Sequence, residues 1–217
     1  MKKRRGKKFK TFFFLFILFC ALAMVQNHFQ QRAPLIVKSD PFADVKKYSP
    51  LIHDELAKYQ LESHTALLTA LMQQESRGKG GDPMQASESA GLARNTITDP
   101  TQSIQAGVKH FQQTLTYGTQ KKVDFSTIIQ SYNMGMGYID YVAEHGGKHS
   151  EVLAKEFSLK RVKEKPTLYT CGGNKNNFRY PYCYGDFTYS TKVTKNIQLL
   201  ADSVPVNEKE KTTSGSF

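Results

Sequence analysis

Cysteines are scarce in this chain, and clusters of metal ligands are missing. Only three of the 217 residues are cysteines, with no CxxC spacing, and the six histidines show no paired ligand spacing. His145 and His149 lie four positions apart, but Gly146 and Gly147 between them would break a helix that aligned them. We therefore expect no metal and no cofactor.

Acidic residues are also few, 19 against 30 Lys and Arg, which gives a formal net charge of +11. A charge of this size is typical of nucleic-acid binders until it is located. Five Lys and two Arg lie within residues 1–10, which leaves +4 for the rest of the chain. No nucleic-acid recognition motif accompanies this mild excess, so we expect no nucleic-acid partner.

A hydrophobic run of ordinary membrane-spanning length is absent. The run from Phe12 to Val25 has fourteen residues, about 21 Å of helix against a hydrocarbon core of roughly 30 Å. Because it follows a basic segment, it has the form of a signal peptide, and Ala21-Leu22-Ala23 supplies small residues for cleavage. An uncleaved anchor is the alternative. In both cases residues 1–26 target the chain to a membrane, and the remainder is exported.

The cysteines favour an oxidising compartment. Cys20 lies in the apolar run, but Phe19 precedes it where a lipoprotein signal would have a small residue, so we do not expect lipidation. Cys171 and Cys183 are twelve positions apart in a stretch rich in Gly, Asn and Tyr. In an exported domain this spacing predicts a disulfide that closes a local loop, with two unpaired thiols as the alternative.

The pattern between the termini is mainly helical. Residues 27–44 lack periodicity and predict a spacer, and residues 205–217 predict a disordered tail, which leaves a domain over 45–204. Asp99-Pro100 predicts a helix start and Gly118 its end. Other helices are predicted around 52–59 and over 65–74, 125–134, 138–144, 151–157 and 189–201. Only residues 165–187 predict a small irregular segment or hairpin.

Glu75 follows the predicted helix over 65–74 and precedes a loop rich in Gly and Pro. Cleaving a glycosidic bond needs a carboxylic acid that keeps its proton near neutral pH, and seating the acid against apolar groups in a cleft achieves this. The glycines would let a substrate approach the backbone closely. By itself, however, a Glu at a helix end is usually a solvated surface residue.

Two longer motifs surround this position. Residues 70–92 read ALMQQESRGKGGDPMQASESAGL, and residues 130–135 read QSYNMG. Together they resemble the goose-type lysozyme and lytic transglycosylase superfamily. The DPMQASE block over 82–88 and the SIQAGV block over 103–108 are similar to the branch that includes pneumococcal vaccine antigen A and the lysozyme domain of conjugation-element cell-wall hydrolases. The resemblance covers roughly residues 47–200 and implies a lysozyme-like helical fold.

Carried over position by position, the resemblance implies that Glu75 is the catalytic acid and Asp82 a second carboxylate. It implies that four residues form the substrate site: Met84 and Gln85 line the sugar cleft, and Tyr132 and Asn133 orient Glu75 and form the floor.

Each assignment has a structural alternative. Tyr132 would otherwise be a core aromatic, Met84 a gap-filler and Asp82 a turn former before Pro83. The Tyr-rich segment over 178–189 would either stack on sugars or pack against the helices.

The implied activity is that of an N-acetylmuramidase acting on peptidoglycan glycan strands at the β-1,4 bond between N-acetylmuramic acid and N-acetylglucosamine. Hydrolysis with inversion uses a second carboxylate to activate water, and Asp82 would take this role. A lytic transglycosylase needs no such water, because a hydroxyl of the substrate closes an anhydro ring. That reaction is one alternative, and a non-catalytic cell-wall-binding protein on the same fold is the other.

Overall fold

The structure is a computed structural model that describes residues 13, 16–24, 26 and 40–203. The chain divides into two compact units, Met1–Ser39 and Asp40–Phe217. In the first unit, residues 16–24 are helical. None of the helices among the described residues is both long and apolar enough to span a bilayer. The predicted spacer lies partly, and the predicted tail wholly, outside these residues.

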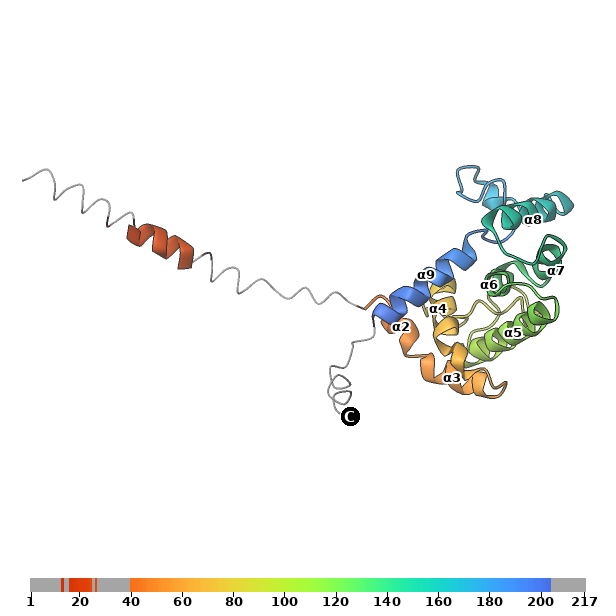
Figure 1. Cartoon of the computed structure of the whole chain (residues 1–217), viewed down its shortest axis with the longest axis horizontal. Helices are drawn as coiled ribbons and strands as arrows, with labels where there is room; N and C mark the ends of the chain where they lie inside the picture. The colour runs from red at the N-terminus through yellow and green to blue at the C-terminus, as the bar shows by residue number, and fades with distance from the viewer. Residues whose placement is uncertain (1–12, 14–15, 25, 27–39, 204–217) are drawn as a thin grey trace, which may run out of the picture. The chain divides into compact units, whose positions relative to one another are not determined.

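The second unit is built from helices, and its described residues contain no strand. Figure 1 shows them in chain order, coloured from orange to blue. The elements are α2 (Ala43–Lys46), α3 (Ser49–Ala57), the 3-10 helix η1 (Glu62–His64), α4 (Thr65–Glu75), α5 (Pro100–Gln120), α6 (Phe125–Met134), α7 (Gly137–Glu144), α8 (Glu151–Glu164), the 3-10 helix η2 (Cys171–Gly173) and α9 (Tyr189–Asp202).

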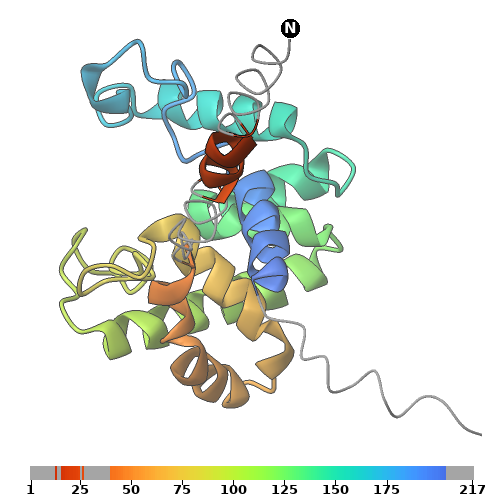
Figure 2. The same cartoon turned by 90° about the vertical axis from the view of Figure 1, so that its left-hand side faces the viewer.

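Two hydrophobic clusters hold these helices together. The larger one joins α3, α4, α5, α6 and α9, with buried side chains that include Ile52, Leu68, Ile104, Ile129 and Val193. The smaller one joins α7 and α8 to the end of α6 through Tyr138, Phe157 and Met134. Helix α9, the last helix of the described residues, packs along α4 (Figures 1 and 2).

Most predicted helices are present, and two of them, α5 and α8, are longer than predicted. Asp99 caps α5 as predicted, accepting hydrogen bonds from the backbone N–H groups of Thr101 and Gln102. The predicted end at Gly118 is wrong, since α5 continues to Gln120. This glycine serves close packing, because a Cβ there would lie 2.5 Å from the Ile128 side chain. Helix α8 runs beyond residue 157 to Glu164, through a mostly polar stretch that carries little periodicity.

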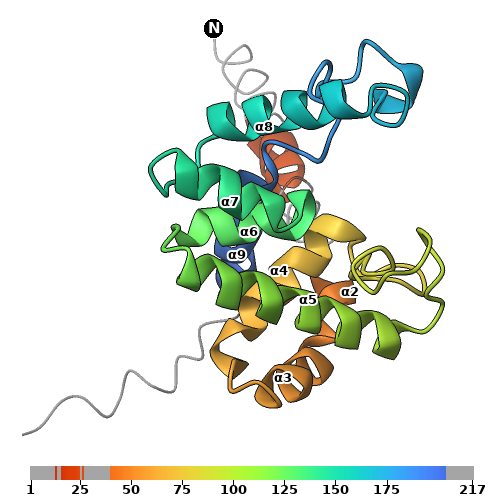
Figure 3. The ribbon, with the colours of Figure 1, turned by 90° about the vertical axis from the view of Figure 1, so that its right-hand side faces the viewer.

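For the segment over 165–187 the sequence predicts either an irregular segment or a hairpin. The structure shows the irregular form. It consists of turns and η2, with left-handed backbone at Cys171, Gly172 and Gly173. Three such residues in succession are incompatible with a strand. Figure 3 shows that this segment and the loop over 76–99 leave the helices on the same side of the unit.

Candidate active site

A cleft of about 810 Å³ lies between these two irregular segments. Its lining combines the end of α4, the loop over 76–99, the end of α6 and the segment over 168–185. Of the residues predicted for the site, Glu75, Asp82, Gln85, Tyr132 and Asn133 line this cleft. The structure therefore brings together five side chains that are up to 58 positions apart in the sequence.

Glu75 is the last residue of α4, whose apolar face is buried in the larger cluster. Burial raises the pKa of the Glu75 carboxyl from 4.5 to about 7, and the negative charges of Asp82 and Asp186 add to this increase. A hydrogen bond from the Tyr189 hydroxyl and the positive charge of Arg94 act in the opposite direction. The balance leaves a carboxylic acid that holds its proton up to neutral pH, which is the property of a general acid.

The chain turns sharply after Glu75 because Ser76 organises the next residues. The Ser76 hydroxyl accepts hydrogen bonds from the N–H groups of Gly78 and Lys79 and donates one of 2.7 Å to the carbonyl of Pro83. Gly81 then passes so close to Thr98 that a Cβ would lie 2.3 Å from its carbonyl oxygen. These contacts fold the loop back toward the end of α4, which brings Asp82 into the cleft.

Asp82 is only 5% exposed, and both of its carboxylate oxygens are occupied. Oδ1 accepts hydrogen bonds from the Ala86 N–H and the Ser103 hydroxyl, at 2.9 and 2.7 Å. Oδ2 accepts from the N–H and hydroxyl of Ser87, at 3.1 and 2.6 Å. These donors outweigh burial and lower the pKa of Asp82, which keeps it ionised. The four bonds match the lone pairs of a carboxylate, so Asp82 anchors the loop in addition to lining the cleft.

Two predicted roles need correction. Met84 does not line the cleft, because its side chain is 0% exposed and belongs to the core. Its backbone instead binds Ser103 and Tyr132. Tyr132 lines the cleft, but its hydroxyl donates to the Met84 carbonyl at 3.3 Å, so the hydroxyl that holds Glu75 belongs to another residue.

That residue is Tyr189, at the start of α9, whose hydroxyl donates a 2.5 Å hydrogen bond to Glu75 Oε1. The sequence singles it out only as one member of a Tyr-rich stretch. Ser103 is a second site residue that the sequence did not predict: its hydroxyl binds both Asp82 and the Met84 N–H. Its position at the start of the SIQAGV block is the sequence feature that could have indicated this role.

Gln85 and Asn133 lie at the cleft through specific backbone contacts. Gln85 adopts a left-handed conformation, with φ at 49°, and its side-chain amide donates to the Asp82 carbonyl. The Asn133 side-chain oxygen accepts a 2.7 Å hydrogen bond from the Asp186 N–H. Asn133 therefore ties the cleft floor to the chain that leads into α9.

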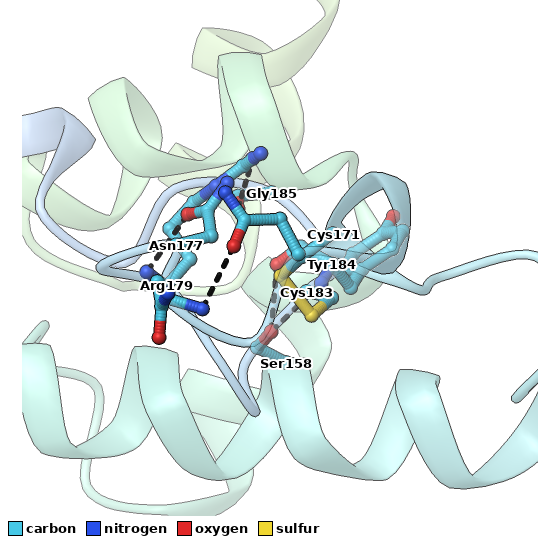
Figure 4. Close-up of a disulfide and its surroundings, with 9 residues drawn as sticks. Ser158, Cys171, Asn177, Arg179, Cys183, Tyr184 and Gly185 are labelled. Atoms are coloured by element: carbon cyan, nitrogen blue, oxygen red, sulfur yellow. Dashed lines mark hydrogen bonds between the residues drawn. A yellow bond between two sulfur atoms is a disulfide. The ribbon is translucent and has the colours of Figure 1, made fainter.

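Residues 168–185 form another wall of the cleft. A disulfide between Cys171 and Cys183 closes the loop within this wall. Figure 4 shows this disulfide beside Ser158 and Tyr184. The Ser158 hydroxyl donates to the Tyr184 carbonyl and accepts from its N–H, which fixes the wall to α8. The Tyr184 hydroxyl donates to the Met134 carbonyl at the end of α6.

A further polar residue of the lining is His110 on α5. Its Nε2 lies 3.2 Å from the Tyr132 carbonyl, to which it donates. Burial lowers the pKa of His110, which keeps the imidazole neutral. Among the described residues, no group of three or more His, Cys, Asp or Glu side chains is arranged to hold a metal ion.

Comparison with known proteins places this geometry in a family. A family model described as lysozyme-like matches residues 42–197, which include the whole cleft. The chain belongs to the lysozyme-like family. The match begins at Phe42, the first buried residue of the described core, and ends within α9.

Three relatives are similar to this chain in sequence. The uncharacterized membrane protein YocA of Bacillus subtilis is 47% identical over 213 residues, 95% of each chain. Pneumococcal vaccine antigen A of Streptococcus pneumoniae is 32% identical over 174 residues, which is 72% of this chain and 82% of the relative. The bifunctional muramidase/DL-endopeptidase CwlT of B. subtilis is 47% identical over 92 residues, 42% of this chain and 27% of CwlT.

Proposed function

We propose that this lysozyme-like protein is an N-acetylmuramidase that hydrolyses the β-1,4 bond between N-acetylmuramic acid and N-acetylglucosamine in peptidoglycan. The observation that carries the proposal is Glu75, an acid whose pKa is raised to about 7 on the wall of an open cleft. The similarity to CwlT, whose name includes a muramidase activity, supports the choice of substrate.

In this proposal Glu75 protonates the glycosidic oxygen, which is the leaving group. Its Oε1 accepts the hydrogen bond from Tyr189, so Oε2 is the atom that carries the transferable proton. Bond cleavage builds positive charge on the sugar ring, in an oxocarbenium-like transition state. Asp82 remains ionised beside Glu75, and its negative charge stabilises this transition state while also raising the pKa of the acid.

The hydrogen bonds of Asp82 also favour a second candidate, a lytic transglycosylase. A general base needs a lone pair directed at the attacking water, and four donors occupy the carboxylate of Asp82. Water activation by Asp82 would require one of these bonds to open. Intramolecular attack by a substrate hydroxyl needs only the acid and the fixed negative charge, both of which the cleft contains.

Mass spectrometry of the products decides between the two reactions. The full-length chain is incubated with purified peptidoglycan, and the soluble fragments are analysed. Reducing ends support hydrolysis, anhydro ends support transglycosylation, and no release by a folded preparation contradicts both. Glu75→Gln should abolish release. The control Glu62→Gln, an exposed Glu on η1 away from the cleft, should retain it.

We also propose that the domain acts outside the cytoplasm, beside the membrane that residues 1–26 target. The disulfide between Cys171 and Cys183 supports an oxidising compartment. YocA, similar along 95% of the chain, is named a membrane protein. Fractionation of cells with an antibody against the domain tests this proposal, and recovery in the cytoplasmic fraction would contradict it.

A further inference from the structure

The cleft wall formed by residues 168–185 carries positive charge and no negative charge. Arg179 is its only charged lining residue, whereas the loop over 76–99 contributes two acids, Asp82 and Glu88, beside Arg94. The chain around this wall is also basic, since residues 160–180 contain six Lys and Arg and one Glu. Glu164 is already paired with Arg161 at 2.6 Å. A substrate in the cleft therefore meets an unbalanced cationic wall.

Within residues 40–203, the Arg179 guanidinium has few partners. One N–H of Nη1 donates to the Gly185 carbonyl at 3.0 Å, and the side chain forms no ion pair with any described residue. An arginine has five N–H donors in a rigid fork that matches a carboxylate. A half-buried fork at a cleft, with four donors left over, is suited to bind an anionic group on a ligand.

Hydrogen bonds within the wall connect this side chain to the floor of the cleft. Arg179 lies inside the loop closed by the disulfide, and its backbone N–H is bound by the Asn177 side chain (Figure 4). Gly185, which accepts from its guanidinium, precedes Asp186, whose N–H binds Asn133 on the cleft floor. Two hydrogen-bonded steps thus connect Arg179 to the floor of the site.

We propose that Arg179 binds a carboxylate on the side chain of the N-acetylmuramoyl sugar. The inference rests on the proposed function, because it takes peptidoglycan as the ligand. Two sources present this chemistry: the peptide stem, which ends in and carries carboxylates, and the lactyl group itself, whose carboxylate is free where the stem has been removed. The residue selects anionic muramoyl strands over neutral polymers of N-acetylglucosamine.

Three substrates separate the two sources. The first is peptidoglycan with its stems, the second is glycan from which an amidase has removed the stems, and the third is that glycan with its lactyl carboxylates converted to neutral amides. Arg179→Gln should lower kcat/KM about 10- to 100-fold on the substrate that supplies the carboxylate, chiefly through KM. On the neutral glycan it should equal the wild type. An equal loss on all three, or on none, would overturn the proposal.

Two control variants isolate the guanidinium. Lys175→Gln removes one positive charge from an exposed position of the same disulfide-closed loop and should leave kcat/KM within about twofold. Arg179→Lys keeps the charge without the fork and should give an intermediate loss.

A binding measurement keeps the inference separate from catalysis. Calorimetry with soluble disaccharide-peptide fragments and their amidated counterparts should show weaker binding of the anionic fragments to Arg179→Gln. If the wild type cuts no substrate but this difference is found, the proposed function fails and the carboxylate site stands. Equal binding of anionic and amidated fragments by the wild type would refute the site.

Discussion

The Tyr189 hydroxyl donates a 2.5 Å hydrogen bond to the Glu75 carboxylate, across 114 positions of sequence. Tyr189 is buried, with only 2% of its surface exposed. The bond fixes one oxygen of the acid and favours its ionised form, which moderates the pKa increase caused by burial. The same contact therefore holds the proposed acid in position and offsets part of the increase in its pKa that burial causes.

Tyr189→Phe should shift the pH dependence of the reaction. Loss of the donor removes the contribution that lowers the pKa of Glu75, so this pKa rises above about 7. Activity that requires the protonated acid should then persist to higher pH, although kcat at pH 6 should fall as the carboxyl loses its orientation. Rates measured from pH 5 to 9 check this. A pH profile that moves to lower pH would contradict the assigned direction.

Glu75→Gln should stabilise the folded chain at high pH while it abolishes cleavage. The raised pKa means that the folded state binds the proton more tightly than the unfolded state, so wild-type stability falls as pH rises from about 4.5 to 7. After allowance for partial exposure, the gain in the variant should reach about 1 to 2 kcal/mol at pH 8 and vanish near pH 4. Denaturant unfolding at both pH values measures it. A constant difference between variant and wild type would show that Glu75 is not perturbed.

Asp82→Asn should destabilise the domain, because an amide cannot accept from all four donors. We expect a loss of about 3 kcal/mol at pH 7. Since the pKa of Asp82 is lowered, its contribution is present above pH 4 and is lost as pH falls further. Asp99→Asn is the matched control, because Asn caps a helix nearly as well as Asp. Equal unfolding midpoints for both variants would contradict the anchoring role.

Gly107→Ala should destabilise the fold, although alanine normally favours a helix interior by about 1 kcal/mol. A Cβ at this position would lie 2.8 Å from the Met84 Cβ and 2.8 Å from the Tyr132 hydroxyl. We expect a loss of about 1 to 3 kcal/mol and reduced activity. Gly137→Ala on α7 is the comparison, since its nearest side-chain atom is 3.7 Å away, on Phe157. Calorimetric melting of both variants measures the change in stability. A stability gain in Gly107→Ala would show that the contacts around Gly107 leave room for a Cβ.

Replacing both Cys171 and Cys183 with Ser should lower stability by about 3 kcal/mol, since the bond closes a short loop in the unfolded chain. Activity should fall even at temperatures where the variant remains folded, because the loop forms one wall of the cleft. Melting and product release are compared with and without reductant. Cys20→Ser removes the remaining cysteine, outside the domain, and should change neither. Full activity of the double variant would mean that the wall does not depend on its disulfide.

Local patterns predicted the helices well where caps and apolar stripes coincide. Helix α6 occupies residues 125–134 as predicted, with Asp124 as its cap and Ile128 and Ile129 in the core. The end predicted at Gly118 is wrong because a glycine that ends a helix and one that admits a neighbouring helix look identical in sequence. The difference lies in Ile128, which belongs to another element.

The site was predicted in part, for a similar reason. The motif indicated which residues gather around Glu75, and most of them line the cleft. It does not indicate the direction of each side chain: Met84, adjacent to Gln85 in the motif, is buried in the core instead of lining the cleft. Tyr189 reaches Glu75, and Arg179 reaches the cleft, only through tertiary packing, which no local spacing reveals.

The packing of α9 on α4 also fixes how much of the chain must be made before the surroundings of Glu75 are complete. Glu75 is synthesised early, whereas the Tyr189 hydroxyl that binds it belongs to α9 and is added 114 residues later. A nascent or truncated polypeptide that ends before position 189 carries the acid without its setting.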